Sequence, residues 1–479
     1  MAEDQLTPQE VNYADWFNEL VLKADLADYS PVRGCMVVKP YGWSLWENCQ
    51  AALDQRFKAT GHTNAAFPLL IPKSFLEKEK EHVEGFSPEL AIVTIGGGEE
   101  LEEPLVIRPT SETIIGYMYS KWIKSWRDLP VLINQWGSVV RWEMRTKLFL
   151  RTTEFYWQEG HTAHETEQEA IEETFRMLDV YEDFAVNEAA IPVVKGIKSQ
   201  TEKFAGAVMS TTIEAMMGDT KSLQSGTSHF LGQNFSKAFD IQFLGRNNEL
   251  QHAWTTSWGL STRMIGAIIM THGDNKGLRL PPRLAPIQVV IVPIYKNDEE
   301  KASVMATAER IFTELKTNQI RVKMDDREGM TPGFKFNDWE MRGVPVRIEI
   351  GPKDVANGTV ATARRDLPGK EGKSFVPQQG LPELVKNLLV DIQASMLKRA
   401  TEFRDTHIFE PKDLNELVEI VKKGWALSHW CESAACEAKV KELSKASTRC
   451  IPLGQEENPG SCIVCGSPAK RKVIFGRAY

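Results

Sequence analysis

The sequence predicts a multidomain protein of mixed α+β and α/β class, with an antiparallel sheet in its first part. At 479 residues the chain is long for one hydrophobic core, so we expect about three domains. Long helices mix with strands up to about residue 283, whereas strands and helices alternate from Ile287 onward. Five of the 7 cysteines lie between Cys431 and Cys465, which indicates a small third domain. We therefore place the domains at 1–283, 284–404 and 405–479.

The first domain is predicted to combine long helices with short strands. Apolar side chains recur at four-residue steps from Leu45 to Phe57, which predicts an amphipathic helix over 43–60 that Gly61 ends. The further elements expected are a strand at 64–72, a β-hairpin at 91–109, a helix at 111–126 with Ser111 as its N-cap, and a helix at 165–190.

The second domain follows a linker rich in proline at 277–286. Its expected elements are strands at 287–295, 320–326 and 344–351, a helix at 298–318, and a helix interrupted by Gly and Pro between the last two strands. This alternation predicts a largely parallel or mixed sheet. The third domain is expected to hold a helix near 413–423 and the clustered cysteines.

Composition limits the possible function classes. Hydrophobic residues at 42% and charged residues at 25% are typical of a globular soluble protein, and no apolar run approaches the roughly 20 residues of a membrane span. The first 20 residues lack the basic and apolar regions of a secretion signal, so we expect a cytoplasmic protein that contacts no membrane. A net charge of −8 argues against extensive coating of nucleic acid but permits local basic patches.

The segment from Val139 to His161 is the most informative part of the chain. It contains an R-x-E unit at Arg141 and Glu143, then an R-x-x-x-F unit at Arg151 and Phe155. A hairpin with this layout can present two guanidiniums to phosphates and an aromatic face to a base, and such cations stabilise the charge that develops during nucleotidyl transfer. The alternative is a strand pair whose surface arginines face carboxylates.

Three other segments carry candidate functional side chains. Thr110 and Glu112 could both accept hydrogen bonds from a bound ammonium group, or they could form an ordinary helix N-terminus. His229 follows a polar cluster with Gln224 and Thr227, and it could equally be a core histidine. Arg263 falls in the first turn of a predicted helix, where the helix dipole disfavours a cation, which hints at a phosphate-directed role.

The C-terminal cysteines form a C-x4-C pair at Cys431 and Cys436 and a C-x2-C pair at Cys462 and Cys465. Four thiolates in two close pairs suit the tetrahedral preference of Zn²⁺, and such a closed site is structural. The alternative is a set of buried reduced thiols. Cys450 lies between the pairs and is a rival ligand that we leave out because it belongs to neither.

Together these segments resemble the signature motifs of the class II aminoacyl-tRNA synthetases. ATGHTNAAFPLLIP resembles motif one, with Pro68 at the dimer interface, VVRWE with FLRTTEF resembles motif two, and WGLSTR resembles motif three. RPTSET, WQEGHTAH and GTSHFLGQNF narrow the resemblance to the prolyl-tRNA synthetases, of the archaeal and eukaryotic-like type that has a C-terminal zinc domain and no inserted editing domain. The resemblance implies a class II catalytic domain at 1–283, an anticodon-binding domain at 284–404 and a zinc-binding domain at 405–479.

The resemblance also implies an activity and a set of site residues. The activity is ATP-dependent attachment of L-proline to tRNA(Pro) through a prolyl-adenylate, by a homodimer that uses Mg²⁺ with ATP. The implied catalytic residues are Arg141, Arg151 and Arg263. The implied ATP-binding residues are Arg141, Glu143, Arg151, Thr152, Phe155, Gln224, Thr227, Ser261 and Arg263. The implied proline-binding residues are Phe86, Thr110, Glu112, Arg141, Trp157, His161 and His229.

In the second domain, Glu340, Arg347 and Lys353 could recognise the guanines of a proline anticodon, or they could form an exposed charged sheet edge. Two other functions remain alternatives. One is a catalytically silent, synthetase-like RNA-binding protein, which the retained Arg141, Arg151 and Arg263 disfavour. The other is a class II synthetase for threonine or glycine, which the aromatic pocket and the short layout disfavour.

Overall fold

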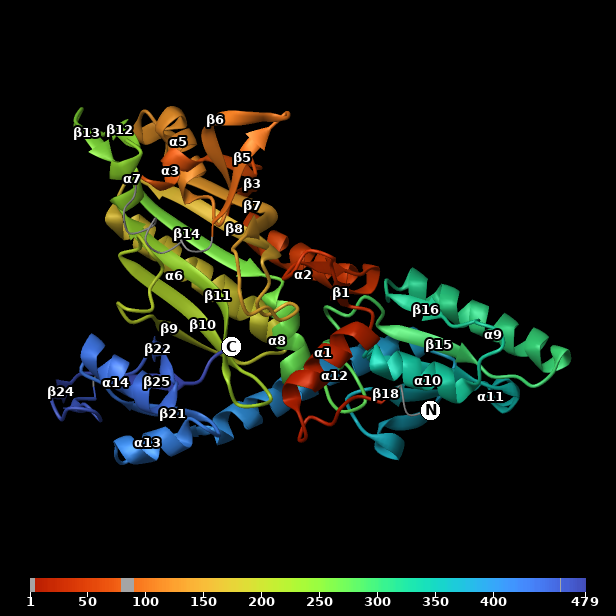
Figure 1. Cartoon of the computed structure of the whole chain (residues 1–479). Coiled ribbons are helices and arrows are strands. Elements are labelled where there is room, and N and C mark those ends of the chain that lie inside the picture. The colour runs from red at the N-terminus through yellow and green to blue at the C-terminus, as the bar shows by residue number, and fades with distance from the viewer. Residues whose placement is uncertain (1–4, 79–89, 457) are drawn as a thin grey trace.

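A sheet of 11 strands joins the first and last parts of the chain in this computed structural model, which describes residues 5–78, 90–456 and 458–479 (Figure 1). Neighbouring strands are antiparallel except for the two outermost pairs, β20–β21 and β3–β7. The strand order is β20 (Ile408–Phe409), β21 (Trp425–His429), β25 (Lys472–Gly476), β22 (Ser447–Pro452), β9 (Val193–Ile197), β10 (Met209–Met216), β11 (Ser222–Gly232), β14 (Trp254–Ser261), β8 (Glu154–His164), β7 (Val131–Val140) and β3 (Thr63–Asn64).

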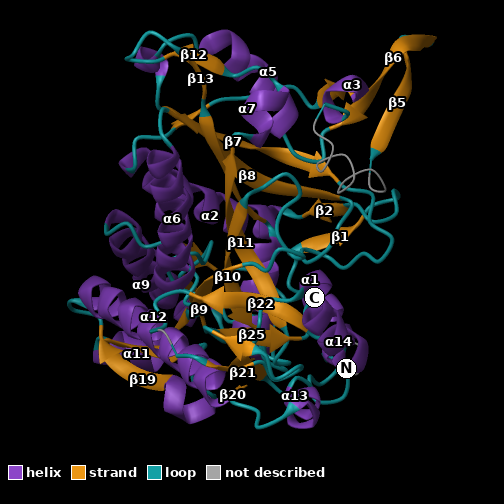
Figure 2. Cartoon of the chain, turned by 90° about the vertical axis from the view of Figure 1, so that its left-hand side faces the viewer, coloured by secondary structure: helices purple, strands orange, loops and turns teal. Residues whose placement is uncertain are grey.

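Helix α6 (Glu167–Asp183) covers one face of this sheet, across β10, β11 and β14 (Figure 2). Its buried Tyr181 lies so close to Gly226 of β11 that a Cβ there would contact the ring at 3.2 Å. Side chains alternate along a strand, so the neighbours of Gly226 point to the opposite face. α2 (Pro40–Ala59) and α8 (Arg263–His272) complete the hydrophobic core on the α6 side.

Two helices differ from their predicted bounds for local reasons. α2 begins at Pro40, three residues before the prediction, because proline suits the first helical turn. α5 (Glu112–Trp122) ends before the predicted Trp126, since Ile123 is extended and Ser125 caps a separate 3-10 turn at Trp126–Asp128. The helix predicted at 165–190 is α6 followed by a π-helical turn at Phe184–Glu188.

The predicted hairpin is part of a three-stranded sheet ordered β4 (Leu70–Pro72), β6 (Glu99–Ile107) and β5 (Ala91–Gly96). Its turn is Gly97–Gly98, both with positive φ, and the acidic residues that follow belong to β6. The strand predicted at 64–72 is divided into β3 and β4.

The middle of the chain forms the predicted mixed sheet, ordered β16 (Val322–Met324), β15 (Val289–Pro293), β17 (Val346–Ile350), β18 (Thr359–Arg364) and β19 (Lys373–Pro377). β15, β16 and β17 are parallel, and β18 and β19 are antiparallel. Its helices are α9 (Asp298–Thr317), α10 (Pro332–Met341), α11 (Pro352–Asn357) and α12 (Leu381–Thr406), the last of which leads into the final part of the chain.

The final part of the chain packs α13 (Leu414–Ile420) and α14 (Ala434–Ser444) against β21, β22 and β25. The remaining elements are α1 (Tyr13–Lys23), β1 (Ala27–Tyr29), β2 (Met36–Val38), α3 (Lys73–Leu76), α7 (Asn234–Ala238), β12 (Gln242–Leu244), β13 (Leu250–His252), β23 (Gly460–Ser461), β24 (Pro468–Ala469) and a 3-10 turn at Gly369–Gly372. Within the described ranges, no helix has the length and apolar character needed to cross a membrane.

Candidate active site

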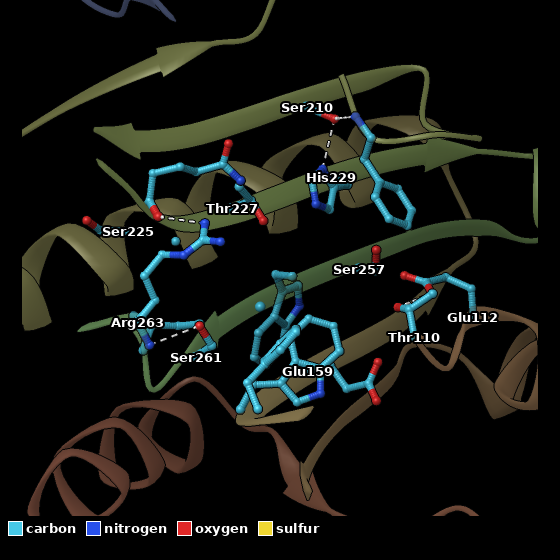
Figure 3. A pocket seen from close by; sticks show the side chains of 18 of the residues that line it. Thr110, Glu112, Glu159, Ser210, Ser225, Thr227, His229, Ser257, Ser261 and Arg263 are labelled. Atoms are coloured by element: carbon cyan, nitrogen blue, oxygen red, sulfur yellow. Dashed lines mark hydrogen bonds between the residues drawn. The ribbon is translucent and has the colours of Figure 1, made fainter. Parts of the chain in front are cut away.

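A pocket lies on the face of the large sheet that points away from α6 (Figure 3). Side chains from β8, β10, β11 and β14 form its floor, and α5 and α8 contribute residues at its ends. The structure brings these predicted site residues together in it: Thr110, Glu112, Arg141, Phe155, Trp157, His161, Gln224, Thr227, His229, Ser261 and Arg263.

Strand register explains why residues far apart in sequence share this floor. Ser210 pairs with His229, His229 with Ser257, and Ser257 with His161, which gives one polar row across β10, β11, β14 and β8. A neighbouring row joins Thr227, Gly259 and Glu159 in the same way. Because side chains two residues apart on a strand share a face, both rows point into the pocket.

At one end of the pocket, Thr110 and Glu112 form a buried polar pair. The Thr110 hydroxyl donates to Glu112 Oε2 at 2.5 Å, and Glu112 begins α5. Ser111 between them is the N-cap residue, but its hydroxyl donates to Glu159 Oε1 rather than capping the helix. Glu112 therefore keeps carboxylate lone pairs for an ammonium donor in the pocket.

Glu159 and His161 form a buried ion pair on β8. His161 Nε2 lies 3.0 Å from Glu159 Oε2, and Ser111 and Gln135 also donate to the carboxylate. Burial lowers the pKa of His161, but the hydrogen bond to Glu159 and the nearby Glu112 outweigh burial and raise it. Burial alone would raise the pKa of Glu159, and the bonds from His161, Ser111 and Gln135 lower it.

His229 is a neutral wall of the pocket. Its Nδ1 lies 2.8 Å from Ser210 Oγ, and its ring stacks on Phe204 with centroids 4.7 Å apart. Burial first, and then the charges of Arg141, Lys198 and His161, lower the pKa of His229 to about 3. The imidazole therefore carries no charge near neutral pH.

Two guanidiniums line the pocket beside aromatic rings. Arg141 lies 5.5 Å from the ring centroids of both Phe155 and Trp157, and its Nε donates to the Pro109 carbonyl. Arg263 donates from Nε to the Leu150 carbonyl at 3.0 Å. Burial and repulsion from Arg141 and Arg151 lower the pKa of Arg263 to about 10, so it stays charged at neutral pH. Such concentrated positive charge suits phosphates.

Gly259 makes room for one of these rings. A Cβ at this position would lie 3.1 Å from Trp157 Cζ3, so glycine leaves room for the indole beside β14. The neighbouring Ser261 accepts a hydrogen bond from the Arg263 backbone N–H and so fixes the start of α8.

The cysteine cluster lies apart from the pocket, in the final part of the chain. The sulfurs of Cys431, Cys436, Cys462 and Cys465 all lie within 4.8 Å of one another. Cys431 Sγ is 3.6 Å from Cys436 Sγ and 3.7 Å from Cys465 Sγ, close to the roughly 3.8 Å edge of a tetrahedral Zn–S4 site. Hydrogen bonds from Ser467 lower the pKa of Cys465 to about 6, whereas burial raises the pKa of Cys431 and Cys436. Cys450 is buried beside Met216 and Trp425, away from this cluster.

The predicted anticodon residues lie on α10, β17 and α11. Glu340 and Arg347 line one small pocket together with Trp339. Arg347 contacts Glu340 at 3.3 Å and Glu349 at 3.0 Å, and it lies 4.0 Å from the Phe336 ring centroid. Lys353 is in the first turn of α11 and does not line this pocket.

Three known protein families match successive parts of the chain. The tRNA synthetase class II core domain (G, H, P, S and T) matches residues 93–272, the anticodon binding domain matches 288–387, and the C-terminal domain of prolyl-tRNA synthetase matches 414–479. The proline–tRNA ligase of Chloroflexus aurantiacus is 59% identical, with 100% of both chains covered. This chain belongs to the prolyl-tRNA synthetase family.

Other members of the family give the same result. The chloroplastic and mitochondrial proline–tRNA ligase of Arabidopsis thaliana is 53% identical over 99% of this chain and 88% of the relative. The structure of prolyl-tRNA synthetase from Cryptosporidium parvum, complexed with halofuginone and AMPPNP, matches with a TM-score of 0.95 at 39% identity, with 100% of both chains covered. The predicted resemblance and fold class are confirmed.

Some predicted synthetase residues lie outside the pocket lining. Glu143 and Arg151 face each other at 3.6 Å, and Thr152 is buried next to Arg151. These residues belong to the connector between β7 and β8, beside the Arg263 end of the pocket. The predicted Phe86 lies outside the described residues.

The pocket also contains residues that the sequence reasoning missed. They include Glu159, Lys198, Glu202, Phe204, Ser210 and Ser257. Glu159 had a usable signal, because it alternates with Trp157 and His161 on one predicted strand and must share their face. Lys198, Glu202 and Phe204 lie in the loop between β9 and β10, which has no periodic pattern.

Proposed function

We propose that this pocket is where proline and ATP meet during the first step of the proline–tRNA ligase reaction. The protein is a class II synthetase that attaches proline to tRNA with ATP, through an adenylate. This placement rests on one observation. The pocket holds two hydrogen-bond acceptors for an ammonium group, Thr110 and Glu112, together with two guanidiniums suited to phosphates, Arg141 and Arg263.

The proline end is proposed to be the one formed by Thr110, Glu112 and His229. The secondary ammonium of proline has two N–H donors, which match the Thr110 hydroxyl oxygen and the Glu112 carboxylate. The neutral ring of His229, stacked on Phe204, offers a surface without positive charge to the pyrrolidine ring. Trp157 and His161 would close the other side, and Phe86 remains a proposed member of this wall.

The ATP end is proposed to be the one near Arg263. Phe155 would stack on adenine, and Glu143 would accept from its amino group. Arg151 and Arg263 would hold the phosphates, and the other proposed ATP contacts are Thr152, Gln224, Thr227 and Ser261. Mg²⁺ bound with ATP would neutralise phosphate charge. Arg141 lies between the two ends, where it could contact both the proline carboxylate and the α-phosphate.

In this arrangement the reaction needs no covalent enzyme intermediate. The proline carboxylate attacks the α-phosphorus, the bond to the β-phosphate bridging oxygen breaks, and pyrophosphate leaves. The terminal ribose hydroxyl of tRNA then attacks the prolyl carbonyl and gives up its proton, the bond between that carbon and the phosphate oxygen breaks, and AMP leaves. Arg141, Arg151 and Arg263 are the proposed catalytic residues, since positioning and charge stabilisation supply the catalysis.

Replacing Arg141 tests the placement. We expect Arg141→Ala to lower proline-dependent ATP–pyrophosphate exchange at least 100-fold, because removing one charge-stabilising group costs about 2.7 to 4 kcal/mol. The control is Arg310→Ala, which removes an exposed arginine that pairs with Glu314 on α9. Near-normal exchange in a folded Arg141→Ala protein would contradict the proposal. Running the assay with threonine and glycine tests the amino acid specificity.

We also propose that the four clustered cysteines bind a structural Zn²⁺. Four thiolates at tetrahedral spacing fit this ion, and Cys436 and Cys462 belong to the small hydrophobic core around α13 and α14. Removing the metal with a strong chelator is expected to lower the unfolding temperature, and zinc, but not magnesium, should restore it. Atomic absorption should find about one zinc per chain in the native protein; a metal-free protein of unchanged stability would contradict this proposal.

We propose that the protein is a homodimer and that it is located in the cytoplasm. β3 forms one edge of the large sheet, and the segment after it exposes Leu69 and Leu70 at 44% and 43%. A second copy packed near Pro68 would cover these apolar side chains. Sedimentation of the free protein tests the dimer, and a monomer at micromolar concentration would contradict it.

A further inference from the structure

In the C-terminal module (residues 405–479), the buried carboxylate of Glu437 bonds to the loop that forms one side of the pocket. This residue is in the first turn of α14, next to Cys436, and only 5% of it is exposed. Its Oε1 accepts a hydrogen bond from Ser199 at 3.0 Å and another from Thr448, and its Oε2 accepts one from Thr201. Two of these donors lie in the loop between β9 and β10.

The same loop forms one side of the pocket. Lys198, Glu202 and Phe204 line the cavity, and the Glu202 backbone N–H donates to Ser199 Oγ at 3.3 Å. Ser199 and Thr201 thus hold the start of a segment that ends at Phe204. β22 of the C-terminal module also pairs with β9 directly before this loop, so the module contacts it on two sides (Figure 1).

A short series of contacts leads from this segment to His229. The Phe204 backbone N–H donates to Ser210 Oγ at 2.9 Å, and the same oxygen lies 2.8 Å from His229 Nδ1 (Figure 3). The Phe204 and His229 rings stack. A displacement of the loop would therefore move both rings that we assign to the proline end.

Packing alone does not account for a carboxylate at this position. A buried charge loses its hydration, and apolar residues of similar volume often stabilise a protein as well or better. Glu437 is compensated by hydroxyl donors, and two of them, Ser199 and Thr201, belong to the loop between β9 and β10. The directional bonds fix the position of the loop, which an apolar contact does not.

We propose that Glu437 is a positioning residue for the amino-acid pocket. Through Ser199 and Thr201 it holds the loop from Lys198 to Phe204, and so sets the placement of Phe204 and His229 against the substrate. This inference rests on the proposed assignment of those two rings to proline. Through Glu437, the C-terminal module would contribute to the affinity for proline.

The test uses full-length, zinc-loaded protein with Thr201→Val, Glu437→Gln and the double variant. Thr201→Val removes one donor from an exposed loop position and leaves α14 unaltered. We expect each single variant to raise the KM for proline in pyrophosphate exchange about three- to tenfold, with the KM for ATP within twofold. The double variant should be no worse than about the larger single effect, because both substitutions weaken the same contact between Glu437 and the loop.

Controls separate positioning from stability and from the site assignment. Glu442→Gln alters an exposed carboxylate on the same helix and should change neither KM. Zinc content should be unchanged in every variant. The proposal is overturned if the KM for proline stays normal in both single variants, whatever the unfolding temperature does. If the proposal fails, His229→Asn shows whether the pocket assignment fails with it. A raised KM for proline in His229→Asn supports the assignment of His229 to the proline end, and a normal KM for proline contradicts that assignment.

Discussion

Burial and neighbouring charges shift the pKa values of the two histidines of the pocket in opposite directions. His229 and His161 belong to one row across the sheet, separated only by Ser257. Burial and the nearby Arg141 lower the pKa of His229, whereas Glu159 and Glu112 raise that of His161 in spite of burial. The pocket therefore combines an uncharged wall with an ion pair, and both lie close to the proposed ammonium site.

Replacing Glu159 with Gln should destabilise the protein in a defined pH window. The folded-state pKa of Glu159 is lowered, so its contribution is present above the ordinary value of 4.5 and is lost as pH falls through the folded value. The folded-state pKa of His161 is raised, so its contribution is present below 6.5 and is lost as pH rises through the folded value. Urea unfolding from pH 4 to 9 should show the largest difference from the native protein between about 4.5 and 6.5. An equal difference at every pH would mean that the ion pair contributes nothing.

At the scale of elements, local patterns predicted several of the strands and helices but not the pairing between distant strands. Alternation on β8 is visible in the sequence and places Phe155, Trp157 and His161 on one face. The pairing of β22 with β9 joins Ile451 to Ile197, and no local pattern encodes a partner so distant along the chain. The β9–β10 loop was missed for the same reason, because its contacts come from elsewhere.

The C-terminal tail is also held by distant contacts. The Tyr479 hydroxyl donates to Asp219 Oδ2 at 2.5 Å, and Lys147 Nζ lies 4.9 Å from the Tyr479 ring centroid. Backbone hydrogen bonds join Lys147 to Arg151, and Arg151 is a proposed ATP ligand. These contacts join residues more than 250 positions apart, so no local pattern in the sequence predicts them.

Removing the Tyr479 ring should therefore weaken ATP binding slightly. A cation–π contact between half-buried groups such as Lys147 and Tyr479 contributes at least about 0.5 to 1 kcal/mol, so Tyr479→Ala should raise the KM for ATP about two- to fivefold. Tyr479→Phe keeps the ring and loses the bond to Asp219, so its KM for ATP should be closer to that of the native protein. The KM for proline serves as the internal reference. A Phe variant as impaired as the Ala variant would assign the effect to the hydroxyl instead.

At the scale of the whole molecule, the middle domain packs firmly against the catalytic part. The segment predicted as a linker pairs with the end of α10, since Leu278 N–H donates to the Met341 carbonyl at 3.0 Å. Arg365 binds Asp274 at 2.6 Å, and Arg342 binds Asp25 at the same distance. Gly277 has a φ of 137° and lies so close to Met341 that a Cβ would clash with its backbone. The residue next to this junction is Glu340, a proposed anticodon ligand.

Glu340→Ala should impair the charging of tRNA without impairing the formation of the prolyl-adenylate. The Glu340 carbonyl accepts from Arg365 Nε, and a side-chain substitution leaves this bond in place, so the domain junction should persist. Arg347 keeps its contact with Glu349 when Glu340 is shortened. We therefore expect charging of tRNA(Pro) to fall about 10- to 100-fold, as for the loss of one specific base contact, with pyrophosphate exchange unchanged. The comparison is Glu383→Ala, which alters a glutamate at the start of α12, away from this pocket, and should affect neither assay. Equal losses in exchange and charging by Glu340→Ala would show that the residue acts through the domain junction rather than on the anticodon.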